Sequence, residues 1–249
     1  MKAQGFRVVI PARYASTRFP GKALAKLAGQ SMIQRVYEQA GACGATEVLI
    51  ATDDERIAEA AQGFGAQVIM TSSDHQSGSD RIAEVAKQRQ WNDDDIIVNV
   101  QGDAPLIPAE AIDQVAGLLL DHSDAAIATL CTALTDAEAV IDPNIVKVVF
   151  DASGKALYFS RSPIPAVAHG AQPPPQFWRH VGIYAYRAGA LRRLAATEPC
   201  ALERSEKLEQ LRAMWLGMEI RVGVAEKMLG PDVDTPEDLA AAEAFIAAN

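Results

Sequence analysis

A cluster of basic residues near the start of the chain is the clearest candidate for chemistry in this sequence. The apolar run 8–10 leads into a loop that carries Arg13, Arg18 and Lys22. The first 37 residues hold seven Lys or Arg and no acid, and removing those charges from the net charge of −9 leaves −16 for the remainder. Arginines bind phosphate oxygens bidentately, and a lysine adds a compact point charge. A cationic loop in an acidic protein therefore predicts an anionic ligand, most simply a phosphate.

The known glycine-rich phosphate motifs do not explain this loop. Ser16 stands where a Walker A loop has its first glycine, and Ala23 replaces the final Ser or Thr. The pair Gly63 and Gly65 lacks the third glycine of a dinucleotide fingerprint. The alternative to a phosphate site is a solvated cationic turn, which the complete absence of acids over 37 residues disfavours.

Two carboxylates are candidate metal ligands. Asp103 follows the apolar run 95–100 and Gly102, so it should project from the edge of a sheet near the basic loop. A single carboxylate there is a common way to hold Mg²⁺, which takes its other ligands from water and substrate phosphates. The alternative for Asp103 is an Asx turn or a helix cap before the prolines that follow.

The second carboxylate, Asp234, precedes a helix start. Thr235 fits the N-cap position, Pro236 the first helical position and Asp238 the third, so capping accounts for all three. Capping leaves Asp234 without a role, and spacing alone allows either a second metal ligand or a surface acid.

Two histidines lie in patterns that permit a binding role. His180, Gly182 and Tyr184 alternate along a predicted strand and should share one face, with the glycine clearing room between the rings. His75 lies in the loop 74–78 before a predicted helix, whose first N–H groups could receive a phosphate or a base edge. The alternative for His180 is a half-buried histidine with satisfied hydrogen bonds.

The elements that must position these residues alternate in the first half of the chain. Strand-like runs occur at 6–10, 47–52, 67–70 and 95–100, separated by helical patterns at 31–42, 54–64 and 79–89. Such βαβ units predict a mostly parallel, Rossmann-like α/β sheet flanked by helices, with ligands at the carboxyl ends of the strands.

The second half of the chain has a different order of predicted helices and strands. The expected elements are a helix at 109–119, a strand at 125–133, a hairpin of 146–150 and 156–161, a strand at 179–186, helices at 187–196 and 202–215, a strand at 219–225 and a helix from 236. A proline-rich loop at 162–176 interrupts them. We therefore predict a nucleotide-binding region at 1–133, a smaller mixed α/β lobe at 134–218 and a return to the main sheet at 219–249.

Composition narrows the class of protein. A pI near 5.0, with no basic stripe beyond residue 37, argues against nucleic-acid binding. Three scattered cysteines without CxxC spacing predict reduced thiols, a cytoplasmic location and no structural zinc. No apolar run reaches the roughly 20 residues of a membrane-spanning helix, so no membrane insertion is expected.

Taken together, these motifs closely resemble the 3-deoxy-manno-octulosonate cytidylyltransferase family, almost from end to end. The matching segments are IPARYASTRFPGK (10–22), DHQSGSDR (74–81), NVQGD (99–103), NIVKVV (144–149), ALYFSR (156–161), RHVGIYAY (179–186), EKLEQLR (206–212) and VDTPEDL (233–239). The resemblance implies a nucleotide-diphospho-sugar transferase type of fold and the synthesis of CMP-Kdo from CTP and Kdo (3-deoxy-D-manno-oct-2-ulosonate) for lipopolysaccharide.

The resemblance also implies roles for individual residues. The triphosphate of CTP would be held by Arg13, Arg18 and Lys22, and the backbone at Ala12, Gln76, Ser77 and Gly78 would read the cytosine. Lys22 and Arg18 would also stabilise the leaving pyrophosphate. Asp103 and Asp234 would be the Mg²⁺ ligands. The catalytic residues would be these two aspartates together with Lys22 and Arg18. The sugar pocket would comprise Gln101, Arg161, His180, Tyr184, Glu209 and Gln210. The family forms homodimers through the smaller lobe, so a homodimer is expected.

The sequence departs from the family pattern at two positions and leaves alternatives open. Ala104 and Asp80 stand where the family often has glutamate, and neither is a metal position. Related enzymes use an 8-amino analogue of the sugar, so the preferred sugar is less certain than the reaction. The alternatives are a CMP-sialate synthetase, an NDP-sugar pyrophosphorylase, a glycosyltransferase and a non-catalytic nucleotide sensor. The triplet 93–95 precedes its strand, unlike the DxD-type metal motif of glycosyltransferases.

Overall fold

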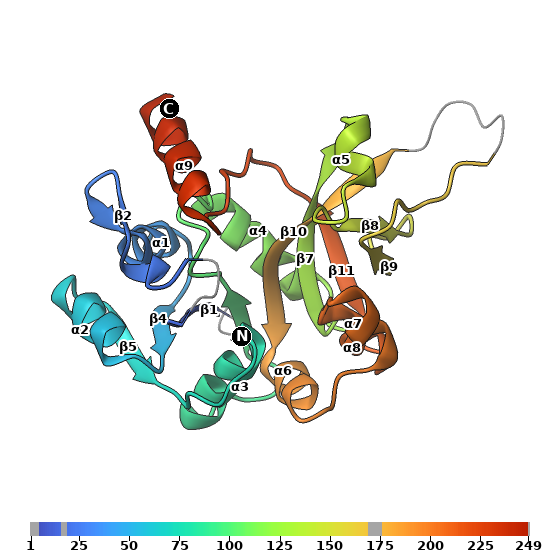
Figure 1. Ribbon diagram of the computed structural model, residues 1–249. Helices are drawn as coiled ribbons and strands as arrows, with labels where there is room; N and C mark the ends of the chain where they lie inside the picture. The colour runs from blue at the N-terminus through green and yellow to red at the C-terminus, as the bar shows by residue number, and fades with distance from the viewer. Residues whose placement is uncertain (1–4, 16–18, 169–175, 249) are drawn as a thin grey trace.

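Four parallel strands from the first half of the chain form one side of a central sheet. The computed structural model describes residues 5–15, 19–168 and 176–248. Strand β1 pairs in parallel with both β4 and β6, and β4 pairs in parallel with β5. These strands are β1 (Phe6–Ala12), β4 (Glu47–Thr52), β5 (Gln67–Met70) and β6 (Ile96–Asn99). The predicted mostly parallel α/β sheet is confirmed (Figure 1).

The second half of the chain extends the same sheet. The order is β11-β7-β10-β6-β1-β4-β5, with β8 pairing to β10 and β9 to β8. The additional strands are β7 (Ile127–Leu134), β8 (Lys147–Phe150), β9 (Ala156–Ser160), β10 (Phe177–Arg187) and β11 (Ile220–Val224). The hairpin of β8 and β9 is antiparallel, as predicted. β10 runs antiparallel to both of its neighbours, β6 and β7, and so joins the two parallel parts of the sheet.

Helices cover both faces of this sheet because its strand residues alternate between them. Val8 and Ile10 pack in one apolar core, whereas Val9 between them packs in the other. The first core receives α1 (Met32–Gly41), α2 (Glu55–Gly63) and α4 (Ala109–Asp121). The second receives α3 (Gly78–Gln88), α6 (Ala188–Ala195) and α8 (Gln210–Trp215). The loops at the carboxyl ends of β1 and β6 are thus held on a rigid, two-faced scaffold.

The chain forms two helices where the sequence predicts one over 202–215. The first is α7 (Ala201–Glu206) and the second is α8, which begins at Gln210. Lys207 between them adopts a left-handed backbone with φ of 55°, which ends the first helix. The break places Glu209 at the start of α8, where a continuous helix would have kept it in the middle of a turn.

Several short elements were not expected from the sequence. They are the turn η1 (Lys22–Leu24), the two-stranded ribbon of β2 (Lys26–Leu27) and β3 (Gln30–Ser31), and α5 (Ala137–Ile141). The last helix, α9 (Pro236–Ala248), begins where predicted. Its start is a capping box, because Asp238 N–H donates to Thr235 Oγ1 at 3.2 Å and Thr235 N–H donates to Asp238 Oδ2 at 2.8 Å.

Three further sequence expectations concern the chain as a whole. Cys43, Cys131 and Cys200 are free thiols, as predicted. Within the described ranges, no helix combines the length and apolar character that a membrane span requires. The division at residues 133 and 218 stays a prediction. β7 and β10, on either side of the predicted lobe's hairpin, belong to the main sheet, and the hairpin itself joins that sheet because β8 pairs with β10 (Figure 1).

Candidate active site

A cavity of about 360 Å³ opens at the carboxyl ends of β1 and β6. Ten of the residues predicted for the site line it: Ala12, Arg13, Lys22, Gln76, Ser77, Gly78, Gln101, Asp103, Glu209 and Asp234. They come from five separate segments of the chain. The parallel strands β1, β5 and β6 bring the first three of these segments to one edge of the sheet, whereas Glu209 comes from the start of α8.

The polar centre of this cavity is a lysine between two carboxylates. Lys22 Nζ lies 2.6 Å from Asp103 Oδ2 and 3.0 Å from Asp234 Oδ1. It also donates to the carbonyl oxygen of Val233 at 3.3 Å. Burial disfavours the charged ammonium, but the two carboxylates outweigh this effect and raise the pKa of Lys22 above its ordinary value. The lysine therefore remains a cation throughout the neutral pH range.

The segment carrying Asp234 is fixed from both sides. Val233 is fully buried, and its N–H donates to the carbonyl oxygen of Asp103 at 2.8 Å. On the other side, the Asp234 N–H donates to Asp238 Oδ2 at 3.0 Å, which ties it to the cap of α9. The spacing of Asp234 before a capping box thus serves to hold its carboxylate beside Asp103.

These two carboxylates fit a divalent cation by the chemistry of their donors. Carboxylate oxygens are preferred ligands of Mg²⁺, which accepts one or two from protein and fills its other positions with water and phosphate. Both carboxylates approach one ammonium, so they are close enough to share a cation. In the described ranges no group of three or more His, Cys, Asp or Glu is arranged to hold a metal by protein ligands alone.

Backbone and loop contacts form the opposite wall of the cavity. α3 begins at Gly78, and its N-cap Ser77 accepts a hydrogen bond from Asp80 N–H at 3.1 Å, as the loop-to-helix prediction required. A Cβ on Gly78 would lie 3.2 Å from Pro11 Cγ, and one on Gly102 would lie 3.0 Å from the Pro11 carbonyl oxygen. Glycine at both positions therefore lets the three loops approach one another closely.

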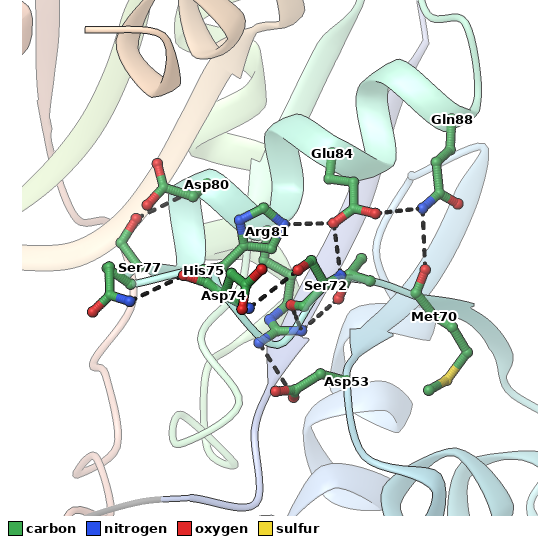
Figure 2. A network of polar contacts seen from close by, with 12 residues as sticks. Asp53, Met70, Ser72, Asp74, His75, Ser77, Asp80, Arg81, Glu84 and Gln88 are labelled. Carbon is green, nitrogen blue, oxygen red and sulfur yellow. Dashed lines mark hydrogen bonds and ion pairs between the residues drawn. The ribbon is translucent and has the colours of Figure 1, made fainter. Parts of the chain in front are cut away.

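A network of charged side chains supports this wall (Figure 2). The buried Arg81, which also lines the cavity, lies 3.2 Å from Asp53 and donates to Thr71 Oγ1. His75 Nε2 lies 2.5 Å from Glu84 Oε2 on α3. Arg81 ends the matched segment 74–81 but is not among the predicted site residues. The sequence feature that could have identified Arg81 is its place in the first turn of the predicted helix that follows the loop 74–78.

The predicted sugar-binding residues are more dispersed. Glu209 and Gln101 line the first cavity, and His180 lines a second cavity of about 840 Å³ that shares Asp234 with the first. Arg161 Nε donates to the Glu206 carbonyl oxygen at 2.6 Å, and Gln210 is buried at the start of α8. Neither of these two lines the two cavities.

His180 and Tyr184 are neighbours, as the strand alternation predicted. Their ring centroids lie 5.2 Å apart. The register of β10 against β7 shifts between Val181 and Tyr184, so the strand bulges at this point. Burial lowers the pKa of His180 to about 3, with a contribution from the Arg179 charge, and burial raises the pKa of Tyr184. Both rings are therefore neutral hydrogen-bonding groups at neutral pH.

Residues that were not predicted for the site also line the second cavity. Arg179 and Asp232 line it together with Asn144 and Thr132. Burial and the nearby Asp103 raise the pKa of Asp232 to about 6, with Asp234 adding to the shift. Arg18 was also predicted to bind nucleotide and act in catalysis, and it lies outside the described residues.

Comparisons with known proteins identify the family. The sequence profile of the family described as Cytidylyltransferase matches residues 7–220. The 3-deoxy-manno-octulosonate cytidylyltransferase of Thioalkalivibrio sulfidiphilus is 54% identical over 98% of this chain and 99% of its own. The chain belongs to the 3-deoxy-manno-octulosonate cytidylyltransferase family. The cytidylyltransferase of the same name from Marinobacter nauticus is 53% identical over 97% of each chain.

Solved structures confirm the cytidylyltransferase fold. A structure of CMP:2-keto-3-deoxy-manno-octonic acid synthetase complexed with CTP superposes with a TM-score of 0.91 at 42% identity, covering 98% of this chain and 99% of its own. A cytidylyltransferase from Leptospira borgpetersenii superposes with a TM-score of 0.64 at 16% identity over 99% of this chain and 87% of its own, which supports the fold alone. The sequence-based family resemblance is confirmed, and the protein is a nucleotidyltransferase.

Proposed function

We propose that this cytidylyltransferase activates 3-deoxy-D-manno-oct-2-ulosonate (Kdo) with CTP, giving CMP-Kdo and pyrophosphate for lipopolysaccharide synthesis. The observation that carries the proposal is the Lys22 ammonium between Asp103 and Asp234, at the edge of a cavity that also holds Arg13. The 54% identity to a relative named 3-deoxy-manno-octulosonate cytidylyltransferase supports the choice of substrates.

The reaction is an in-line displacement. The anomeric hydroxyl of the sugar attacks the α-phosphorus of CTP, the bond to the β-phosphate breaks, and pyrophosphate leaves. Positioning and neutralisation of charge dominate such phosphoryl chemistry. Mg²⁺ bound at Asp103 and Asp234 would polarise the α-phosphate and lower the pKa of the attacking hydroxyl, so no separate protein base is required.

Lys22 has a different role before and after the substrates bind. In the ligand-free protein its ammonium neutralises Asp103 and Asp234, which prevents the two carboxylates from repelling each other. With Asp103 and Asp234 holding a divalent cation, Lys22 Nζ would instead donate to triphosphate oxygens. Arg13 and Arg18 add bidentate contacts to the same anion. Together, Lys22 and Arg18 stabilise the charge that develops on the leaving pyrophosphate.

The nucleotide and the sugar would meet at the metal carboxylates, because predicted sugar-binding residues line both cavities. The backbone at Ala12, Gln76, Ser77 and Gly78 would hold the base. Kdo would be held by Gln101, Glu209 and Gln210 on one side, and by Arg161, His180 and Tyr184 on the other. Asp234 lines both cavities, so a sugar in the second cavity would reach a phosphate in the first at this residue.

We also infer a cytoplasmic homodimer. Three free cysteines fit a reducing compartment. The exposed large apolar side chains outside the predicted nucleotide-binding region include Leu157 on β9 at 57% and Trp215 on α8 at 65%, and a partner subunit would cover such surface. Sedimentation velocity at several protein concentrations tests this assembly, and a monomer at every concentration would contradict it.

The deciding experiment for the activity is pyrophosphate release from CTP and Mg²⁺ with a panel of sugars. The panel contains Kdo, its 8-amino analogue and a sialic acid, each with CTP and with UTP. We expect the highest kcat/KM with CTP and Kdo. A preference for sialic acid, or binding of CTP without pyrophosphate release from any sugar, would overturn the proposal.

A further inference from the structure

Glu84 is a shared acceptor at the centre of the network behind the nucleotide cavity. Its Oε2 accepts from Ser72 N–H at 2.9 Å and lies 2.5 Å from His75 Nε2, while its Oε1 accepts from Gln88 Nε2 at 2.8 Å. Burial would raise the pKa of Glu84, but these donors outweigh it and hold the pKa below the ordinary value. Glu84 is therefore an ionised carboxylate that can only accept hydrogen bonds.

The charge of Glu84 fixes which nitrogen of His75 carries the hydrogen. Since a carboxylate has no hydrogen to give, His75 Nε2 must be the donor in their contact. A neutral imidazole has one donor and one acceptor nitrogen, so Nδ1 presents a lone pair. Figure 2 shows the second ring nitrogen on the side away from Glu84, toward Ser77. Among the described residues no donor reaches Nδ1, while the His75 side chain is 21% exposed and lines the cavity.

The charge distribution of the cavity favours the nucleobase at the His75 end, where the cationic Arg81 is paired with Asp53. Lys22, Arg13 and the two carboxylates gather at the end that suits the triphosphate and its cation. The wall around Gly78 holds loop backbone and the apolar edge of Pro11, which suit the flat face of a base. His75 belongs to this second wall, so its acceptor nitrogen would be available to the part of the ligand where bases differ.

Cytosine and uracil differ most in the group at position 4 of the ring. Cytosine carries an amino group there, which donates, whereas uracil carries a carbonyl oxygen, which only accepts. A fixed acceptor accepts from the amino group and opposes the carbonyl, because two lone pairs would then face each other without a hydrogen. Sites built around one directed hydrogen bond reject the analogue that lacks its partner.

We propose that Glu84 is a positioning residue that holds His75 as a hydrogen-bond acceptor for the exocyclic amino group of the base, and so makes the site select CTP over UTP. The proposal rests on the proposed function, because it takes the cavity to be the CTP site. Glu84 acts through His75 and through the Ser72 backbone, and it does not itself line the cavity.

The test compares CTP with UTP in the wild-type protein and in four variants, at about pH 8, where an imidazole is ordinarily neutral. His75→Phe removes the acceptor and leaves the other two contacts of Glu84 intact. Glu84→Ala removes the carboxylate, and Glu84→Gln keeps an oxygen for Ser72 and His75. Gln88→Ala is the matched control, because Gln88 bonds the same carboxylate from the exposed side of α3.

The readouts are kcat/KM for pyrophosphate release with Kdo and the dissociation constants of both nucleotides. In His75→Phe and Glu84→Ala, the CTP/UTP ratio of kcat/KM should fall about tenfold, mainly through KM for CTP. Glu84→Gln and Gln88→Ala should keep ratios within about twofold of wild type. Thermal unfolding identifies variants that do not fold, and His75→Phe decides the question if Glu84→Ala is one of them.

Three outcomes would overturn the inference. Parallel losses with CTP and UTP would mean that Glu84 only stabilises the loop. An unchanged ratio in His75→Phe would mean that the base is read elsewhere. A wild-type protein that turns over CTP and UTP equally would refute the selectivity but leave the cytidylyltransferase activity standing. Failure of the proposed function looks different, since the wild-type protein would then release no pyrophosphate from CTP and Kdo.

Discussion

The Arg81 guanidinium and the Asp53 carboxylate lie 3.2 Å apart and join α3 to the segment after β4 (Figure 2). The Arg81 side chain is only 4% exposed, and it also donates to Thr71 Oγ1. Arg81→Met leaves Asp53 without its counter-charge, so we expect the free energy of unfolding in urea to fall by about 3 kcal/mol. Adding Asp53→Asn should recover part of this loss. A single variant as stable as wild type would mean that the ion pair contributes little.

Asp103→Asn should abolish turnover while leaving CTP binding largely intact. The amide has lost the negative charge that a divalent cation requires, but the cationic contacts to the triphosphate remain. We expect kcat to fall by a factor of about 10³, measured by pyrophosphate release, while calorimetry shows CTP binding within about fivefold of wild type. Asp124→Asn, on the exposed loop before β7, is the matched control. Near-normal turnover of Asp103→Asn at ordinary magnesium concentration would refute the metal assignment.

Lys22→Met should separate metal binding from catalysis. Without the ammonium, a metal ion no longer competes with Lys22 for the two carboxylates, so Mg²⁺ or Mn²⁺ should bind the nucleotide-free protein several-fold more tightly. Turnover should nevertheless fall by a factor of about 10² or more, because the leaving pyrophosphate loses a cationic donor. Titration with Mn²⁺ followed by electron paramagnetic resonance measures the first effect. Weaker metal binding in the variant would contradict the proposed exchange of cations.

Lys147 stabilises the loop that borders the second cavity. Its buried Nζ donates to the carbonyl oxygens of Asp142 at 2.9 Å, Ile145 at 2.5 Å and Arg161 at 2.6 Å. Lys147→Met would leave these carbonyls without a donor and should cost about 2–3 kcal/mol of stability. Chemical denaturation gives this value. A loss below about 0.5 kcal/mol would show that water replaces the ammonium.

His180 should make the protein less stable in mild acid. The unfolded chain protonates this histidine near its ordinary pKa of 6.5, whereas in the folded chain burial lowers that pKa to about 3. Between these values the unfolded state binds more protons, so the free energy of unfolding falls as the pH drops. We expect His180→Gln to flatten this dependence by about 2 kcal/mol between pH 6.5 and about pH 4.5, measured by urea denaturation. Parallel curves would contradict the shift.

The sequence predicts the parallel half of the fold well because its signals are local. Hydrophobic periodicity identified β4 and β5 with their exact bounds, and the capping residues located the start of α9. The position of β10 between β6 and β7 depends on pairing across distant segments, which no local pattern encodes. The break between α7 and α8 depends on one left-handed residue, Lys207, whose side chain gives no sign of it.

In the candidate site too, local signals predict some residues, and contacts between distant segments determine the others. Arg13, Lys22 and Asp103 stand out because their loops follow apolar runs and their charges are unusual for the region. Asp234 looks like a surface acid by spacing alone, and only the fold brings it to Lys22. The pairings of Arg81 with Asp53 and of His75 with Glu84 each join α3 to a separate loop, so they become visible only in three dimensions.

The contact of Lys22 with both carboxylates also constrains how the protein folds. Lys22 is separated from Asp103 by 81 residues along the chain and from Asp234 by 212. Closing loops of this length costs chain entropy before any contact compensates for it, and contacts of high sequence separation form slowly. An intermediate that has assembled only the strands up to β6 holds one carboxylate and lacks the other. Such an intermediate would be compact and partly native, yet it would have no complete cation site.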